Sequence, residues 1–187
     1  MRSSDNKAFK EWAVVCRALG SGRQMIILRK GGIAEAPGGF EVTDKQFFLY
    51  PTYLHQSPTS VVPAWSDALS QCVNPAPGKV TIEHYAIVQS WVRVRTMEKL
   101  KALRSEHILA DAVVEERFKR WAEDSVHALM VRVYELPEPV AIPELDTYAG
   151  CKSWLTLAEQ VPLTGARPVL EDADFEKRMA AVRAIFR

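Results

Sequence analysis

The sequence predicts an α+β fold organised around a mostly antiparallel sheet. Stretches of strand type come first, two helical segments interrupt them, and strands return before a last helix. This order lacks the regular strand–helix alternation of a doubly wound parallel sheet. A barrel-like sheet of the PUA-like kind is one arrangement that fits, with a helical insertion at about residues 97–122 and a C-terminal helix at about 173–187.

Length and composition indicate one domain over residues 1–187. A chain of 187 residues is long enough to bury a single core. Hydrophobic residues make up 48% and charged residues 25%, which is typical of a globular protein and argues against disorder. No apolar run reaches the roughly 18–20 residues of a membrane helix, and the first residues have no signal-peptide pattern. We therefore expect a cytoplasmic protein without a membrane partner.

The first third of the chain carries three strand patterns. Two apolar runs, 12–19 and 24–29, flank the link Gly20-Ser21-Gly22 and predict a β-hairpin. A third strand is expected over residues 47–52, where Pro51 restricts it to an edge or to the end of a strand. The Pro51 end is therefore expected to be open to partners.

The rest of the chain alternates strand and helix patterns. The strand patterns cover residues 79–95, 127–136 (ended by Pro137) and 151–157. The helix patterns cover residues 65–72, 97–108, 111–121 and 173–187. The alternation over residues 79–95 directs Arg93 and Arg95 to one face, which pairs them as a candidate phosphate contact.

No metal site or cofactor is predicted. The four histidines lie 29, 23 and 20 residues apart, without an HxxxH or CxxC pair. The three cysteines are odd in number and widely spaced, as expected of buried free thiols. The acidic-x-Lys triplet of restriction-type nucleases occurs only at Asp5-Asn6-Lys7, near the start of the chain, which argues against that nuclease type.

Polar and aromatic residues collect where predicted strands end. A glycine turn after Arg29 and Lys30 suits phosphate, although an ordinary turn is the alternative. A Gly-Cys-Lys-Ser turn before Trp154 could form a stacking platform, although Trp154 also fits a core position. We expect these clusters to meet in one cleft. The candidate site residues are Arg29, Lys30, Gly31, Gly32, Tyr50, Thr52, His55, Gln56, Lys152, Ser153 and Trp154.

Five stretches carry a resemblance to a known family. They are FKEWAV (9–14), LRKGGI (28–33), FLYPTYLHQ (48–56), RVYEL (132–136) and YAGCKSW (148–154). In this order and spacing they resemble the bacterial family known as domain of unknown function 1802, over about residues 9–157. The resemblance supplies no activity. Members of that family are sometimes joined to restriction-endonuclease-like domains, which implies a link to DNA restriction or repair and a partner of that type.

The segment GSGRQMIILRK (20–30) is similar, more weakly, to the opening hairpin of ASCH and other PUA-like domains. Those domains are small β-barrels that bind RNA or modified bases. The acidic residue that they often carry before the Arg-Lys pair is missing here, since Ile27 and Leu28 occupy the positions.

Three functions stay open from the sequence, and whether the protein is an enzyme is undecided. The first is a nucleic-acid-binding module for DNA or RNA, part of a restriction or defence system. Because the net charge is only +1, such binding needs a local patch. The second is a metal-independent phosphodiesterase or nuclease with His55 as general base and Lys152 or Arg29 stabilising developing charge. The third is a protein-interaction subunit that docks a partner through the helices of residues 97–121.

Overall fold

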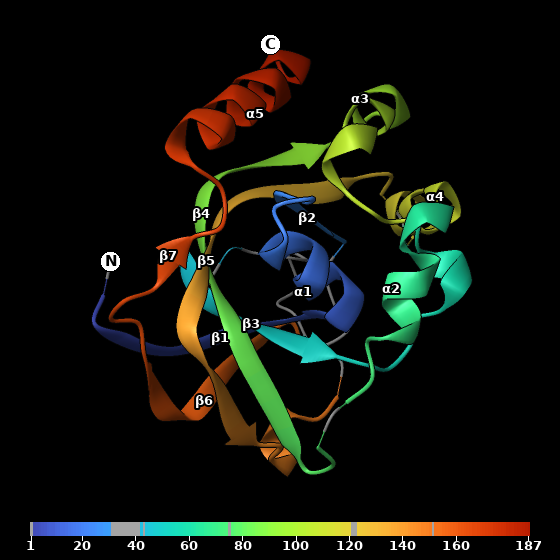
Figure 1. Cartoon of the computed structure of the whole chain (residues 1–187). Helices are drawn as coiled ribbons and strands as arrows, with labels where there is room; N and C mark the ends of the chain where they lie inside the picture. Colours follow the sequence, from blue (N-terminus) through green and yellow to red (C-terminus); the bar gives the residue numbers. More distant parts are fainter. Residues whose placement is uncertain (1, 31–41, 43, 75, 121–122, 151) are drawn as a thin grey trace.

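A computed structural model describes the whole chain except residues 1, 31–41, 43, 75, 121–122 and 151 (Figure 1). The strands are β1 (Ser4–Trp12), β2 (Ile26–Arg29), β3 (Gln46–Thr52), β4 (Lys79–Val94), β5 (Val126–Pro143), β6 (Trp154–Pro162) and β7 (Arg167–Pro168). The α-helices are α1 (Ala13–Gly20), α2 (Ser66–Ser70), α3 (Met97–Ala102), α4 (Asp111–Lys119) and α5 (Asp172–Ile185). Short 3-10 turns are η1 (Pro58–Ser60), η2 (Pro63–Trp65), η3 (Arg104–Glu106) and η4 (Asp146–Tyr148).

The strands form one mixed sheet in the order β2-β5-β4-β3-β1-β6, and β7 adds to β5. Among the described strand pairs only β1 and β3 are parallel, so the predicted α+β class with a mostly antiparallel sheet is confirmed. The sheet is not a closed barrel, because within the described residues β2 and β6 end the path without pairing to each other. Figure 1 shows α3 and α5 near one end of the β4–β5 ribbon and β6 toward the other.

The predicted hairpin over residues 12–29 is wrong in its first half, which is the helix α1. Six of the eight residues of α1 are buried, so its sequence is apolar nearly all round. Periodicity cannot separate such a helix from a buried strand. The helix explains the parallel pair, since β1 and β3 can run parallel only if a crossover connects them, and α1 begins that crossover. The glycine link is a turn as expected, with Gly22 at a φ of +71°.

The long β4–β5 ribbon corrects a second expectation. The strand predicted to stop at Pro137 continues to Pro143. The register between β4 and β5 shifts between Ile82, which opposes Val140, and His84, which opposes Glu135. The extra residues of β5 therefore form a bulge that contains Pro137, and a bulge tolerates proline because ladder hydrogen bonds are interrupted there.

The apolar core has two parts. The larger part joins α1, α5 and the β2–β5 region, and its residues include Val14, Leu129 and Met179. The smaller part lies around Phe48 and Tyr85, whose rings meet edge to face with centroids 4.9 Å apart. No helix in the described part of the chain is long and apolar enough to cross a membrane.

Candidate functional site

Arg29 ends β2 and joins three distant parts of the chain. Its guanidinium donates a hydrogen bond to the Ser153 hydroxyl at 2.6 Å, and its Nη1 lies 3.6 Å from Oε2 of Glu11. It also lies over the Phe9 ring, with Cζ 4.9 Å from the centroid. Glu11 and Ser153 are only 3% and 1% exposed, whereas the Arg29 side chain is 21% exposed. The buried carboxylate is thus paired with a cation that still reaches solvent.

Two further predicted residues surround this pair. Trp154 packs edge to face against Phe9 and Phe47, with ring centroids 4.7 and 5.1 Å away, so its partly buried indole packs against the core. Thr52 opposes the last residue of β1, and its hydroxyl donates to the Glu11 carbonyl at 3.3 Å. Arg29, Thr52, Ser153 and Trp154 therefore meet at the end of β1.

Arg117 is a second cation whose charge interacts with that of Glu11, and the prediction missed it. Its guanidinium lies 4.9 Å from the centroid of the Trp12 ring and donates to the Leu28 carbonyl at 2.8 Å. Burial lowers the pKa of Arg117, and the negative charge of Glu11 opposes that shift. The signal in the sequence was an arginine on the same helix face as the apolar Val114.

Lys30 contacts other parts of the chain than Arg29 does, and its ammonium is fully engaged within the protein. Its ammonium donates to the carbonyls of Phe118 at 3.0 Å and Ser125 at 2.8 Å, and also to the carbonyl of Glu123. An ammonium has three N–H donors, so these three carbonyls use all of them. Burial lowers the pKa of Lys30. The geometry makes Lys30 a clamp on the α4–β5 connection.

Tyr50 lies on the other face of the sheet from Glu11. It opposes Lys10 of β1, is 2% exposed, and packs edge to face on Tyr148 with centroids 5.9 Å apart. Its hydroxyl has no hydrogen-bond partner among the described residues. Burial raises the pKa of Tyr50 to about 12. Tyr50 is therefore not brought into the group around Arg29.

His55 and Gln56 lie in the turn after β3. The Gln56 side chain accepts from the Val14 N–H at 3.3 Å and donates to the Cys72 carbonyl at 3.1 Å, which ties α1 to the segment after α2. His55 is exposed and has a φ of +64°. In the described part of the chain no hydrogen bond or ion pair reaches its ring. Lys152 is also exposed, and Gly31 and Gly32 lie outside the described residues.

Strand register places a row of basic side chains across the sheet. His127 of β5 opposes Arg29 of β2 on one side and Arg93 of β4 on the other. Directly opposed residues of antiparallel strands project from the same face. Trp91, two residues before Arg93, is 51% exposed, and its ring lies 5.9 Å from the His127 ring at 37°. The sequence pattern identified Arg93, but the neighbours that continue the row depend on tertiary pairing.

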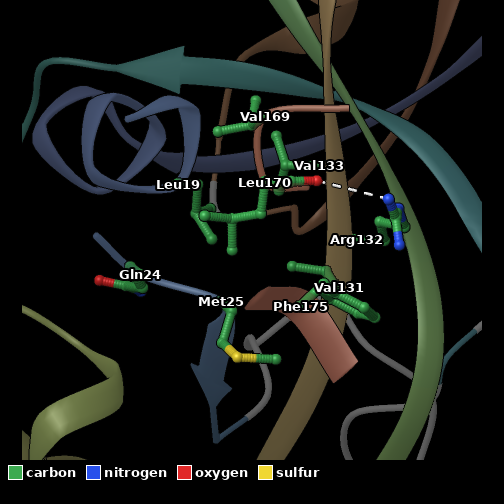
Figure 2. A pocket seen from close by; sticks show the side chains of 9 residues that line it. All are labelled: Leu19, Gln24, Met25, Val131, Arg132, Val133, Val169, Leu170 and Phe175. Atoms are coloured by element: carbon green, nitrogen blue, oxygen red, sulfur yellow. Dashed lines mark hydrogen bonds between the residues drawn. The ribbon is translucent and has the colours of Figure 1, made fainter. Parts of the chain in front are cut away.

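The described residues offer little for a small ligand or metal. They contain no group of three or more His, Cys, Asp or Glu that could hold a metal ion. Figure 2 shows a cavity between α1, β2, β5 and the start of α5, lined by side chains that include Leu19, Met25 and Phe175. It has about 10 Å³ of space, which is about enough for one water. This cavity is therefore too small to hold a larger ligand.

Solved structures similar to this chain include ASCH from Zymomonas mobilis, with 13% identity, a TM-score of 0.44 and 93% of each chain covered. A Ser-to-Ala mutant of ZmASCH has 12% identity and a TM-score of 0.46, with 96% of this chain and 98% of that chain covered. A Tyr-to-Phe mutant has 12% identity and a TM-score of 0.44, with 93% and 96% covered. No curated protein matches the chain.

The family model described as "Domain of unknown function (DUF1802)" matches residues 8–181. This range contains every described residue of the group around Arg29 and of the row through His127. It also confirms the family resemblance of the five sequence stretches. The chain belongs to the DUF1802 family.

Proposed function

We propose that this protein is a nucleic-acid-binding module that contacts its ligand through the row Arg29–His127–Arg93 and the adjacent Trp91. The observation that carries the proposal is this row, in which basic side chains from three strands lie on one face beside an exposed indole. Backbone phosphates are bound by arginine, and unpaired bases stack on aromatic rings.

The affinity for nucleic acid depends on where the cationic side chains lie on the surface. With a net charge of +1, the protein has no strong overall field, so affinity must come from a local set of cations. Arg93 and Arg95 are 32% and 64% exposed. Lys30, by contrast, donates all three of its N–H groups to backbone carbonyls of the protein. Arg93 and Arg95 are therefore better placed than Lys30 to meet phosphate.

An exposed tryptophan favours single-stranded ligands. Indole stacking needs a base whose face is open, which a duplex does not offer. Of the other predicted site residues, the exposed Lys152 and the partly exposed Thr52 lie near Arg29 in sequence register or contact, and we propose that they extend the path. We also propose that the module acts in DNA restriction or repair beside an endonuclease-like partner, as the domain combinations of its family imply.

Fluorescence anisotropy with labelled 20-mers of single- and double-stranded DNA and RNA tests the proposal. The wild-type protein should bind single strands best, and Trp91→Ala should weaken that binding about tenfold, since one base–aromatic stack contributes roughly 1–3 kcal/mol. Leu54→Ala is the matched control, because Leu54 is also an exposed apolar residue, at 74%, but lies in the turn after β3. Failure to bind any probe at low salt would contradict the proposal.

A further inference from the structure

The carboxylate of Glu123 stands between the two arginines at the end of β4. One of its oxygens, Oε2, accepts a hydrogen bond from Arg93, and the other, Oε1, lies 3.9 Å from Nε of Arg95. Arg93 makes a second hydrogen bond, in which its Nε donates to the Ser125 hydroxyl at 3.1 Å. Two guanidinium groups thus share one internal anion, with one carboxylate oxygen facing each.

This anion is held weakly. The side chains of Glu123 and Arg95 are 58% and 64% exposed, and Arg93 is 32% exposed. Ion pairs at this level of exposure contribute little to stability and are screened by salt. A phosphodiester group presents two oxygens that share one negative charge, as a carboxylate does, and arginine binds both kinds of anion through paired N–H donors.

We propose that Arg93 and Arg95 form a phosphate subsite, and that Glu123 occupies it as an intramolecular competitor which an incoming phosphodiester displaces. The inference rests on the proposed function and adds to it a defined subsite and a built-in restraint on affinity.

The strand geometry gives the subsite a direction. Residues at two-residue intervals along a strand lie about 6.7 Å apart on the same face. Trp91 and Arg93 follow this interval within β4, and Arg95 comes two residues later, just past the end of the strand. Val94 between the arginines is buried, at 1% exposure. A nucleotide whose phosphate replaces the Glu123 carboxylate would therefore place its base or that of its neighbour near the exposed Trp91 ring.

Removing the competitor should raise affinity. Glu123→Gln should lower the Kd for a single-stranded 20-mer about two- to fivefold, the range expected from loss of an exposed ion pair. The slope of log affinity against log salt should become steeper by up to about one. The reason is that the vacant arginines then bind anions from solution, which the nucleic acid must displace. In an Arg93→Gln/Arg95→Gln background, Glu123→Gln should have no such effect.

Two matched controls separate displacement from a general change in charge. Asp124→Asn removes the same charge one residue away, but no ion pair joins Asp124 to an arginine among the described residues. Glu176→Gln removes a carboxylate of similar exposure, 64%, that lies 3.9 Å from Arg183 on α5. Neither control should raise affinity as Glu123→Gln does. An equal gain with Asp124→Asn would overturn the competitor role.

A titration with inorganic phosphate tests the subsite without nucleic acid. The NMR signals of the arginine side chains report the binding. Phosphate should shift the Arg93 and Arg95 Nε–H signals saturably, and at lower concentration in Glu123→Gln than in wild-type protein. Identical titrations of the two proteins would overturn the inference even if nucleic acid binds. A difference between them without any nucleic-acid binding would leave the subsite standing and remove the proposed function.

Discussion

The guanidinium of Arg29 donates to the hydroxyl of Ser153 at 2.6 Å, although the two residues are 124 positions apart in the sequence. Arg29 ends β2, and Ser153 immediately precedes β6. These strands are the two ends of the sheet path. Side chains thus connect the two edges of a sheet that its backbone leaves open, with the buried Glu11 carboxylate beside them.

Glu11→Gln should therefore destabilise the protein. It removes the buried carboxylate that is paired with Arg29. We expect a loss of about 2 kcal/mol in the free energy of unfolding, below the roughly 3–5 kcal/mol of a fully buried pair because Arg29 is partly solvated. Urea unfolding measures the change. Glu176→Gln, at an exposed position of α5, should cost less than about 0.5 kcal/mol. Equal losses for the two variants would show that Glu11 has no special role.

Sequence patterns predicted the elements better than the contacts. The alternation in β4 and the apolar face of α5 are local features, and both elements were found. The buried helix α1 was mistaken for a strand because it has almost no polar face to reveal its period. The bulge that admits Pro137 depends on the register with β4, which the sequence of β5 does not contain.

Local sequence patterns also predicted only part of the group around Arg29, because some of its contacts depend on tertiary structure. Arg29, Thr52, Ser153 and Trp154 were found together because strand ends concentrate polar residues. Glu11 was missed, since an acidic residue within a strand gives no sign that it is buried. The sequence also could not reveal that Lys30 reaches three carbonyls as far away as Ser125.

Lys30→Met offers a second test. Three carbonyls at the α4–β5 connection would lose their donor, and an unsatisfied buried polar group costs about 1–3 kcal/mol. We therefore expect lower stability in urea unfolding but an unchanged salt dependence of nucleic-acid binding. If the slope of log affinity against log salt instead became shallower by about one, Lys30 would be identified as a direct phosphate contact.

His107 should make stability depend on pH. Burial lowers the pKa of His107 to about 3, and the nearby Arg104 charge acts in the same direction. Arg104 donates to its Nδ1 at 2.8 Å, which requires a neutral ring. Below pH 6.5 the unfolded chain gains a proton on this residue while the folded protein does not. Stability is therefore lost as the pH falls from about 6.5 toward 3, by about 2 kcal/mol between pH 7 and pH 5.

Urea unfolding of wild-type protein and His107→Gln at pH 7 and pH 5 measures this contribution. Glutamine does not titrate, so the variant should lose about 2 kcal/mol less over this interval, whatever its stability at pH 7. Parallel losses in the two proteins would show that His107 is protonated in the folded state.

His55→Ala should leave nucleic-acid binding unchanged, because His55 lies in the turn after β3 and outside the row through His127. The phosphodiesterase hypothesis makes a different prediction. Labelled DNA and RNA incubated with chelator would then be cleaved by wild-type protein and left intact by His55→Ala. Gel analysis of these reactions separates the two hypotheses, and we expect no His55-dependent cleavage.

The salt dependence of binding to a single-stranded 20-mer tests the interface most directly. We compare wild-type protein with Arg93→Gln/Arg95→Gln, and use Arg183→Gln as a control because Arg183 is 53% exposed and also lies 3.9 Å from a carboxylate. The double variant should bind all sequences more weakly, and its slope of log affinity against log salt should be shallower by about one to two, whereas Arg183→Gln should match the wild type. Equal slopes for wild-type protein and the double variant would contradict the proposed interface.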